Sequence, residues 1–382
     1  MWQALLLVFL TALLGINNGA HFLTVDKTTK KFKHNGQTIF LAGMNQAWND
    51  YARDFGNHLY AKNKADLERY LKAIHDAGGN SVRIWLHIEG ENTPQFDSHG
   101  FVTAPDRDGT LISDMKQYLQ AAYRYNILVF FCLWNGATHQ TDKLEGLIKT
   151  EAKLDTYINK ALIPIVRGVK SEPALGGWDI INEPNNVMIP YLYNSERCFD
   201  TKSFAGGGKA HLYTMQQIQK FVNWQADAIH REDPKSLVTV GVINQWFITD
   251  QFYAKNFYTD HCLKLAGARN QGHLDFYTVH TYASSSSHYQ GHAPFLKNAD
   301  DYKLDKPIVI AEFSEYCGGG MTINQQYQYA YNHGWSGAWS WHARGPKGSC
   351  SDDLITQEDG IRSVRNYNDQ SKGGLVKLNL HV

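Results

Sequence analysis

The sequence predicts an α/β fold, in which eight strands alternate with helices around a single TIM (β/α)8 barrel. Eight short β-branched or aromatic runs alternate with longer amphipathic stretches, which implies parallel strands joined by right-handed crossovers. Eight such units close a TIM barrel. The competing doubly wound sheet would carry a glycine fingerprint after its first strand, and neither Gly206–Gly208 nor Gly318–Gly320 follows such a turn. The 382 residues exceed the ~250 of a plain barrel, which predicts enlarged loops on the catalytic face.

The predicted elements follow in order along the chain. A small N-terminal hairpin comes first, because Asn35-Gly36 is a type I′ turn signal between alternating segments. Buried strands are predicted from the apolar runs at 39–45, 81–87, 127–134, 176–184, 237–241, 274–282, 307–313 and 337–342. Helical spacing of apolar residues predicts helices over Lys64–Ala77, Leu111–Tyr125, Leu154–Lys170, Leu212–Arg231 and Asn324–His333.

Composition narrows the class of protein. Lys and Arg number 37, Asp and Glu also number 37, and the two signs are interspersed. A nucleic-acid partner would require a basic patch or stripe, so none is expected. Hydrophobic residues make up 43% of the chain and charged residues 19%, which is the opposite of a disordered composition and supports a large core.

The first residues read as a secretory signal peptide. The apolar run from Ala4 to Leu14 has the length of a signal-peptide core and is too short to span a bilayer. We predict cleavage between residues 17 and 20, which divides the chain into a signal peptide at 1–19 and a catalytic domain at 20–382. No other stretch has membrane length, so a secreted, extracellular protein without membrane partners is expected.

Secretion makes the five cysteines candidates for disulfides, with one left over. Cys132 lies in a buried strand pattern and should be the free thiol. Cys317 and Cys350 follow neighbouring barrel strands, so their loops should lie side by side. Cys198 and Cys262 form the remaining pair. No N-x-Ser/Thr sequon occurs in the chain, so N-glycosylation is not expected.

Two carboxylates are placed at ends of predicted strands, where the catalytic residues of a barrel project. Glu183 ends the fourth strand and Glu312 ends the seventh. Further polar or aromatic side chains lie on the second, fourth, sixth and eighth strands, namely Arg83, Asn182, His280, Tyr282 and Trp341.

Two carboxylates at one barrel mouth are the minimum equipment for glycoside hydrolysis. One protonates the leaving oxygen and the other attacks or assists at the sugar carbon. Burial and a second carboxylate favour a proton on the acid, whereas a nearby Arg and a Tyr hydroxyl keep the nucleophile ionised.

These motifs resemble glycoside hydrolase family 5. The resemblance is carried by IINEP around Glu183, VHTY ending at Tyr282, IAEF around Glu312, and Arg83 and Trp341 on their strands. The longer stretches LAGMNQAWNDYARDFG and VRIWLHIEG look like the β-mannanases of invertebrate digestive fluids. The similarity runs over essentially the whole mature chain.

The resemblance implies Glu183 as acid/base and Glu312 as nucleophile in a retaining reaction on β-1,4-linked mannan. Arg83, Asn182, His280, Tyr282 and Trp341 would support them, without a metal or organic cofactor. Trp48, Trp85, Trp134, His139 and Trp246 lie near strand ends and are candidates for lining sugar subsites. The sequence departs from many family members after the third strand, where 134–137 read Trp-Asn-Gly-Ala, which puts a function of that strand in doubt.

Three alternatives stay open. The same chemistry could act on a β-1,4-glucan, because mannose and glucose differ only at carbon two. A sugar-binding barrel without catalysis would be expected to lack one carboxylate, and both are present. A metal-dependent hydrolase is suggested by 17 His, but no His-x-His occurs. A polysaccharide is the expected partner, and a monomer is the expected state.

Overall fold

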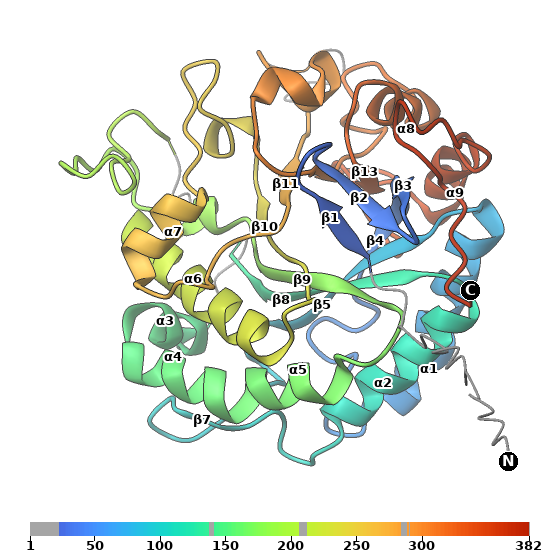
Figure 1. Cartoon of the computed structure of the whole chain (residues 1–382). Helices are drawn as coiled ribbons and strands as arrows, with labels where there is room; N and C mark the ends of the chain where they lie inside the picture. The colour runs from blue at the N-terminus through green and yellow to red at the C-terminus, as the bar shows by residue number, and fades with distance from the viewer. Residues whose placement is uncertain (1–22, 137–140, 206–211, 284–288, 290, 382) are drawn as a thin grey trace, which may run out of the picture.

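The computed structural model describes residues 23–136, 141–205, 212–283, 289 and 291–381. Eight parallel strands close a barrel in the order β10-β11-β12-β13-β4-β5-β8-β9, with helices around its outside (Figure 1). The fold prediction is confirmed. The barrel strands are β4 (Leu41–Ala47), β5 (Ser81–Ile88), β8 (Leu128–Asn135), β9 (Leu175–Asn182), β10 (Val238–Val242), β11 (Tyr277–His280), β12 (Ile308–Glu312) and β13 (Gly337–Ser340).

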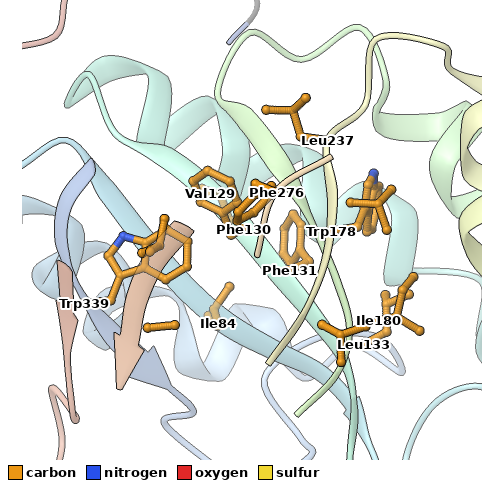
Figure 2. Packing of buried hydrophobic residues seen from close by; sticks show 14 of the residues in the cluster. Ile84, Val129, Phe130, Phe131, Leu133, Trp178, Ile180, Leu237, Phe276 and Trp339 are labelled. Atoms are coloured by element: carbon orange, nitrogen blue, oxygen red, sulfur yellow. The ribbon is translucent and has the colours of Figure 1, made fainter. Parts of the chain in front are cut away.

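Large aromatic side chains fill the barrel interior. The Phe130 ring on β8 lies 4.8 Å from the Trp339 ring on β13 and 5.9 Å from the Phe276 ring before β11. The Trp339 indole N–H donates to the Ser81 hydroxyl at 2.9 Å, so its burial leaves no polar group unpaired. Figure 2 shows these rings beside aliphatic residues of the neighbouring strands. This packing makes the barrel a solid core that fixes where each strand ends.

A small antiparallel sheet packs against one end of the barrel. It contains β1 (Thr24–Asp26), β2 (Lys31–His34) and β3 (Gln37–Ile39), in blue in Figure 1. The predicted turn joins β2 to β3, with φ of 50° at Asn35 and 78° at Gly36, the positive values that a type I′ turn requires. Phe32 on β2 is buried against Phe276, so the sheet covers the amino-terminal end of the barrel.

Five predicted helices are present with shifted ends. They are α1 (Tyr60–Ala77), α2 (Leu111–Arg124), α4 and α5 (Glu151–Tyr157 and Ile163–Val169, joined by a π-helical turn at Ile158–Leu162), α6 (Met215–Glu232) and α8 (Ile323–Asn332). The predicted start at Leu212 was wrong because Thr214 and Gln217 form a capping box that begins α6 at Met215. Pro164 lies in the first turn of α5, where its missing N–H is tolerated.

Three short α-helices and two short strands were not predicted from the sequence. They are α3 (Asp142–Lys149), α7 (Asp260–Gly267), α9 (Leu354–Arg362), β6 (Gln95–Phe96) and β7 (Val102–Ala104). Each has at most nine residues, too few for periodicity to separate from loop sequence. No helix in the described part of the chain is long and apolar enough to cross a membrane.

Disulfides tie together segments that follow neighbouring strands, and one of the cysteines, Cys262, lies in α7 and not in a loop. Cys198 is bonded to Cys262 and Cys317 to Cys350, with Cα atoms 5.2 and 4.9 Å apart. Cys132 is a buried free thiol. These are the pairs that barrel order predicts. The second bond ties the loop after β12 to the loop after β13. The predicted signal peptide lies outside the described residues.

A buried histidine links the end of α6 to the segment before β11. His230 Nδ1 faces the Gln271 carbonyl oxygen at 2.6 Å, and its Nε2 faces Asp275 Oδ2 at 2.9 Å. Both partners are acceptors, so both hydrogen bonds require a doubly protonated ring. Burial alone would lower the pKa of His230, but the hydrogen bond and charge of Asp275 outweigh it and the pKa is raised. The stacked ring of His273 has a lowered pKa, chiefly through burial.

This arrangement predicts a pH-dependent contribution to stability. Because the folded-state pKa of His230 is raised, its contribution is complete below the ordinary value of 6.5 and is lost as pH rises through the raised pKa. We expect His230→Gln to lower the free energy of unfolding more at pH 6.5 than at pH 9. Urea unfolding at both values measures this, with exposed His99→Gln as the control. An equal loss at both values would contradict it.

Candidate active site

A cavity of about 690 Å³ opens at the carboxyl ends of the barrel strands. Four of the predicted site residues line it with polar groups, namely Asn182, Glu183, Tyr282 and Glu312. Trp48, Trp85, Trp246 and Trp341 contribute aromatic faces to the same cavity. Residues from distant parts of the chain therefore meet in one cleft.

Glu183 projects from a left-handed turn directly after β9. Its φ is 46° and its ψ is 51°, a conformation that is costly for a residue with a Cβ. The Glu183 backbone N–H donates to the Gly241 carbonyl on β10 at 2.6 Å, which holds the turn against the barrel. The carboxylate accepts from Asn186 Nδ2 at 2.9 Å through Oε2. Since its side chain is 13% exposed, the carboxylate reaches the cavity while staying fixed.

Glu312, at the end of β12, is held from two sides. Arg83 Nη1 donates to Glu312 Oε1 at 2.8 Å, and the Tyr282 hydroxyl donates to Oε2 at 3.0 Å. Arg83 is fully buried, and burial raises the pKa of Tyr282 well above 10, so its hydroxyl stays protonated as a donor. Both carboxylate oxygens are therefore oriented before any ligand binds.

His280 connects the two carboxylates. Its Nδ1 lies 2.9 Å from Glu183 Oε1 and 3.5 Å from Glu312 Oε2. Burial lowers the pKa of His280 to about 4, so the ring is neutral near pH 7. It therefore acts on Glu183 through a hydrogen bond and not through a positive charge.

The ionisation of Glu312 is a balance of opposing effects. Burial raises the pKa of Glu312 above its ordinary value of 4.5, and Glu183 acts in the same direction. A positive His280 and Arg83 would both lower it, but His280 is neutral near pH 7. The pKa of Glu312 is raised overall, and Arg83 is the group that favours its charged form in this pH range.

A buried network around Arg83 contains two residues that the sequence analysis missed. Asp179 Oδ2 accepts from Arg83 Nε at 2.8 Å and from Nη2 at 2.6 Å. Asn45 Oδ1 accepts from Nη1 at 3.1 Å. Asn182 Oδ1 accepts from Nη2 at 2.8 Å. Asn45 and Asp179 are polar residues inside otherwise apolar strands. This pattern could have indicated the network, because buried polar groups need hydrogen-bond partners.

The third strand, doubtful from the sequence, supports the Asn-Glu-Pro segment directly. Asn182 Nδ2 donates to Asn135 Oδ1 at 3.0 Å. The Gly136 N–H donates to the Asn182 carbonyl at 2.6 Å. A Cβ at Gly136 would lie 2.9–3.0 Å from backbone atoms of 182–184, so the close approach requires glycine there.

Three tryptophans form one aromatic wall of the cavity. Trp48 and Trp341 have ring centroids 5.9 Å apart, and Trp85 lies 5.4 Å from Trp341. All three pairs of rings meet edge to face, which is a favourable aromatic geometry. Trp246 lines the cavity from the segment after β10. Trp48, Trp246 and Trp341 thus line the cavity, and their contact with a sugar stays a prediction.

The prediction for Trp134 was wrong. Its side chain is completely buried, and its indole N–H donates to Gln225 of α6 at 3.1 Å. The ring packs against Tyr157 and Phe221, so it lies between the barrel and its helices and not at the cavity. Strand alternation decides this, because neighbouring side chains point to opposite faces. His139 lies outside the described residues.

Three side chains at the site could present ligand atoms to a cation. One donor atom each from Glu183, His280 and Glu312 lies within 4.8 Å of the others. However, Arg83 already donates to Glu312, and its buried positive charge would repel a cation there. The donor set therefore fits proton transfer better than metal binding.

Comparisons with known proteins agree with this geometry. No family model matches the chain. A mannan endo-1,4-β-mannosidase from Mytilus edulis is 44% identical over 352 residues, covering 91% of this chain and 93% of the relative. An endo-1,4-β-mannanase structure from Eisenia fetida has 43% identity and a TM-score of 0.91, over 94% of this chain and 100% of that one. A β-1,4-mannanase structure from Aplysia kurodai has 47% identity and a TM-score of 0.87, over 93% and 99%.

Relatives at this identity over nine-tenths of the chain share more than a barrel. The two carboxylates facing one cleft supply the chemical groups that hydrolysis of a glycosidic bond needs. The chain belongs to the family of the mannan endo-1,4-β-mannosidases, and the protein is a glycoside hydrolase.

Proposed function

We propose that the protein is a secreted endo-β-1,4-mannanase that cleaves internal bonds of mannan, glucomannan and galactomannan with retention of configuration. The observation that carries the mechanism is the closeness of the two carboxylates. One oxygen of Glu183 and one oxygen of Glu312 lie within 4.8 Å of each other. Retaining enzymes space their carboxyl groups ~5–5.5 Å apart, whereas inverting ones leave ~6.5–9.5 Å for a water.

In the first step Glu312 attacks the anomeric carbon and forms a glycosyl ester. Glu183 donates its proton to the glycosidic oxygen as the carbon–oxygen bond breaks, and the reducing-end fragment leaves as an alcohol. Arg83 and Tyr282 hold the Glu312 oxygens in place, which reduces the entropy cost of reaching the reactive geometry.

In the second step the ionised Glu183 takes a proton from water, which attacks the same carbon. The ester bond breaks, and Glu312 leaves as a carboxylate. His280 contacts Glu183 at 2.9 Å and keeps its carboxylate oriented through both steps. The cycle regenerates both groups without any cofactor.

Mannan is the substrate that the relatives favour. The relative from Mytilus edulis and the structures from Eisenia fetida and Aplysia kurodai are named for activity on β-1,4-mannan. The tryptophan wall provides an apolar surface against which a sugar ring can pack. Side-chain tolerance for galactose is part of the proposal.

Secretion and a monomeric state complete the proposal. The apolar run at residues 4–14 supports export, and two disulfides are typical of an oxidising compartment. The even charge balance supports a neutral polysaccharide partner in place of nucleic acid.

Retention of configuration is the first experimental test. Proton NMR of freshly formed products from mannohexaose should show the β anomer first, with the α anomer appearing only as mutarotation proceeds. Initial rates on galactomannan and glucomannan should exceed the rate on carboxymethylcellulose. Immediate appearance of the α anomer would exclude the double displacement, and a faster rate on the cellulose derivative would exclude mannan as the preferred substrate.

A further inference from the structure

Asp179 is a buried carboxylate that touches neither the cavity nor a catalytic carboxylate. It lies on β9 and is 1% exposed. Oδ2 accepts both Arg83 bonds, and Oδ1 accepts from the Gly241 backbone N–H at 2.9 Å. Both oxygens therefore face donors that are fixed by the barrel itself.

Arg83 has no spare donor once Asp179 is counted. Its Nε–H and one Nη2–H point to Asp179, and the other Nη2–H points to Asn182. The two Nη1–H groups point to Asn45 and Glu312. All five N–H groups of the guanidinium are used, so its orientation on Glu312 is determined by the whole set.

The Gly241 backbone connects this network to the backbone of Glu183. Its N–H binds Asp179, and its carbonyl accepts from the Glu183 backbone N–H. A Cβ there would lie 2.6 Å from Arg83 Nη2 and 3.2 Å from His280 Nε2. The pairing of β9 with β10 shifts register between Thr239 and Gly241, which places the Gly241 amide opposite the Asp179 side chain.

We propose that Asp179, braced by Gly241, is a positioning residue that divides the charge of Arg83 between two carboxylates and thereby sets the ionisation of Glu312. This rests on the proposed role of Glu312 as nucleophile. With Asp179 present, the positive charge of Arg83 interacts with two carboxylates, Asp179 and Glu312. Without it, the full positive charge acts on Glu312, which makes that carboxylate less basic and a weaker nucleophile.

The substitution Asp179→Asn removes the negative charge of the side chain and keeps its size, so it tests the role of that charge. Asparagine has one carbonyl oxygen, so it can satisfy Arg83 or the Gly241 N–H but not both. We expect kcat/KM on a soluble manno-oligosaccharide to fall about 100-fold, and the acid limb of its pH profile to move down by about one unit. KM should change less than kcat.

A matched control separates positioning from stability. Asp106 is also buried and accepts two backbone N–H bonds, from Asn57 and Thr110, but has no contact with Arg83. Asp106→Asn should lower the melting temperature and leave the acid limb unmoved. If Asp179→Asn behaves in the same way, Asp179 is only structural and the proposal is wrong.

Gly241→Ala is the second variant, and it decides the question if Asp179→Asn does not fold. It removes no charge, but its methyl group must displace Arg83, so a lower kcat/KM and a moved acid limb are expected. An unmoved limb in the folded variant overturns the proposal. If the wild type hydrolyses β-1,4-glucan and not mannan, the proposed substrate fails, and the same comparison is made on glucan.

Discussion

Glu312→Gln is expected to reduce hydrolysis of mannan on the order of 10⁴-fold or more, because the amide cannot form the glycosyl ester. The substitution keeps the shape of a side chain that is 4% exposed and held by Arg83 and Tyr282. The fold should therefore persist. Release of reducing ends from galactomannan measures the loss, and circular dichroism checks the fold.

A second readout ties the loss to nucleophilic attack. A 2-deoxy-2-fluoro-mannoside with a good leaving group should label the wild type at one site, detected as one sugar mass on the peptide that contains Glu312. The Gln variant should stay unlabelled. Wild-type rates for Glu312→Gln, or a label on another peptide, would remove the assignment.

Glu183→Ala is expected to lower mannan hydrolysis by about 10²–10⁴-fold, the usual contribution of a general acid/base. The loss should depend on the leaving group. An aryl mannoside whose phenol leaves without a proton should still glycosylate Glu312, so that the second step becomes slow and the intermediate accumulates.

Azide distinguishes this role from a general structural defect. A small anion can occupy the space of the missing carboxylate and attack the intermediate without needing a base. We expect azide to restore turnover of the aryl mannoside and to yield the β-mannosyl azide. Glu312→Gln is the matched control, because it forms no intermediate and should gain nothing from azide. Absence of rescue in Glu183→Ala would contradict the role of Glu183.

The acid side of the pH profile should report Glu312. Burial raises the pKa of Glu312, and His280 is neutral near pH 7 because burial lowers its pKa to about 4. Loss of kcat/KM on acidification should therefore set in above the ordinary value of 4.5 for a glutamate. The acid limb of the Asp179→Asn variant is to be compared with this acid limb of the wild-type profile.

The barrel strands and their ends could be predicted from the sequence for a physical reason. Each barrel strand is an apolar run bounded by polar loops, and parallel strands in a closed barrel end at one face. Knowing only that Glu183 and Glu312 end their strands places both carboxylates at one mouth. The cysteine pairs follow from the same loop order, because loops after neighbouring strands are adjacent.

The sequence did not determine whether a side chain near a strand end points into the cavity or outward to the helices. Trp134 lies near a strand end as the cavity tryptophans do, yet it points outward to α6 and is buried there. One position along a strand reverses the face, and the irregular ends of strands make that position hard to assign from sequence. The register shift between β9 and β10 is one such irregularity.

The sequence by itself determined the barrel, the two carboxylates, the cysteine pairs and the family, because these depend on local pattern and on strand order. Only the tertiary structure decided how Arg83 is shared. Asp179, Asn45 and Gly241 act through hydrogen bonds shorter than about 3.2 Å that join four strands, β4, β5, β9 and β10. Such contacts depend on strand register and packing and leave no periodic pattern in the sequence. The arrangement of charges around Glu312 could therefore be identified only from the tertiary structure.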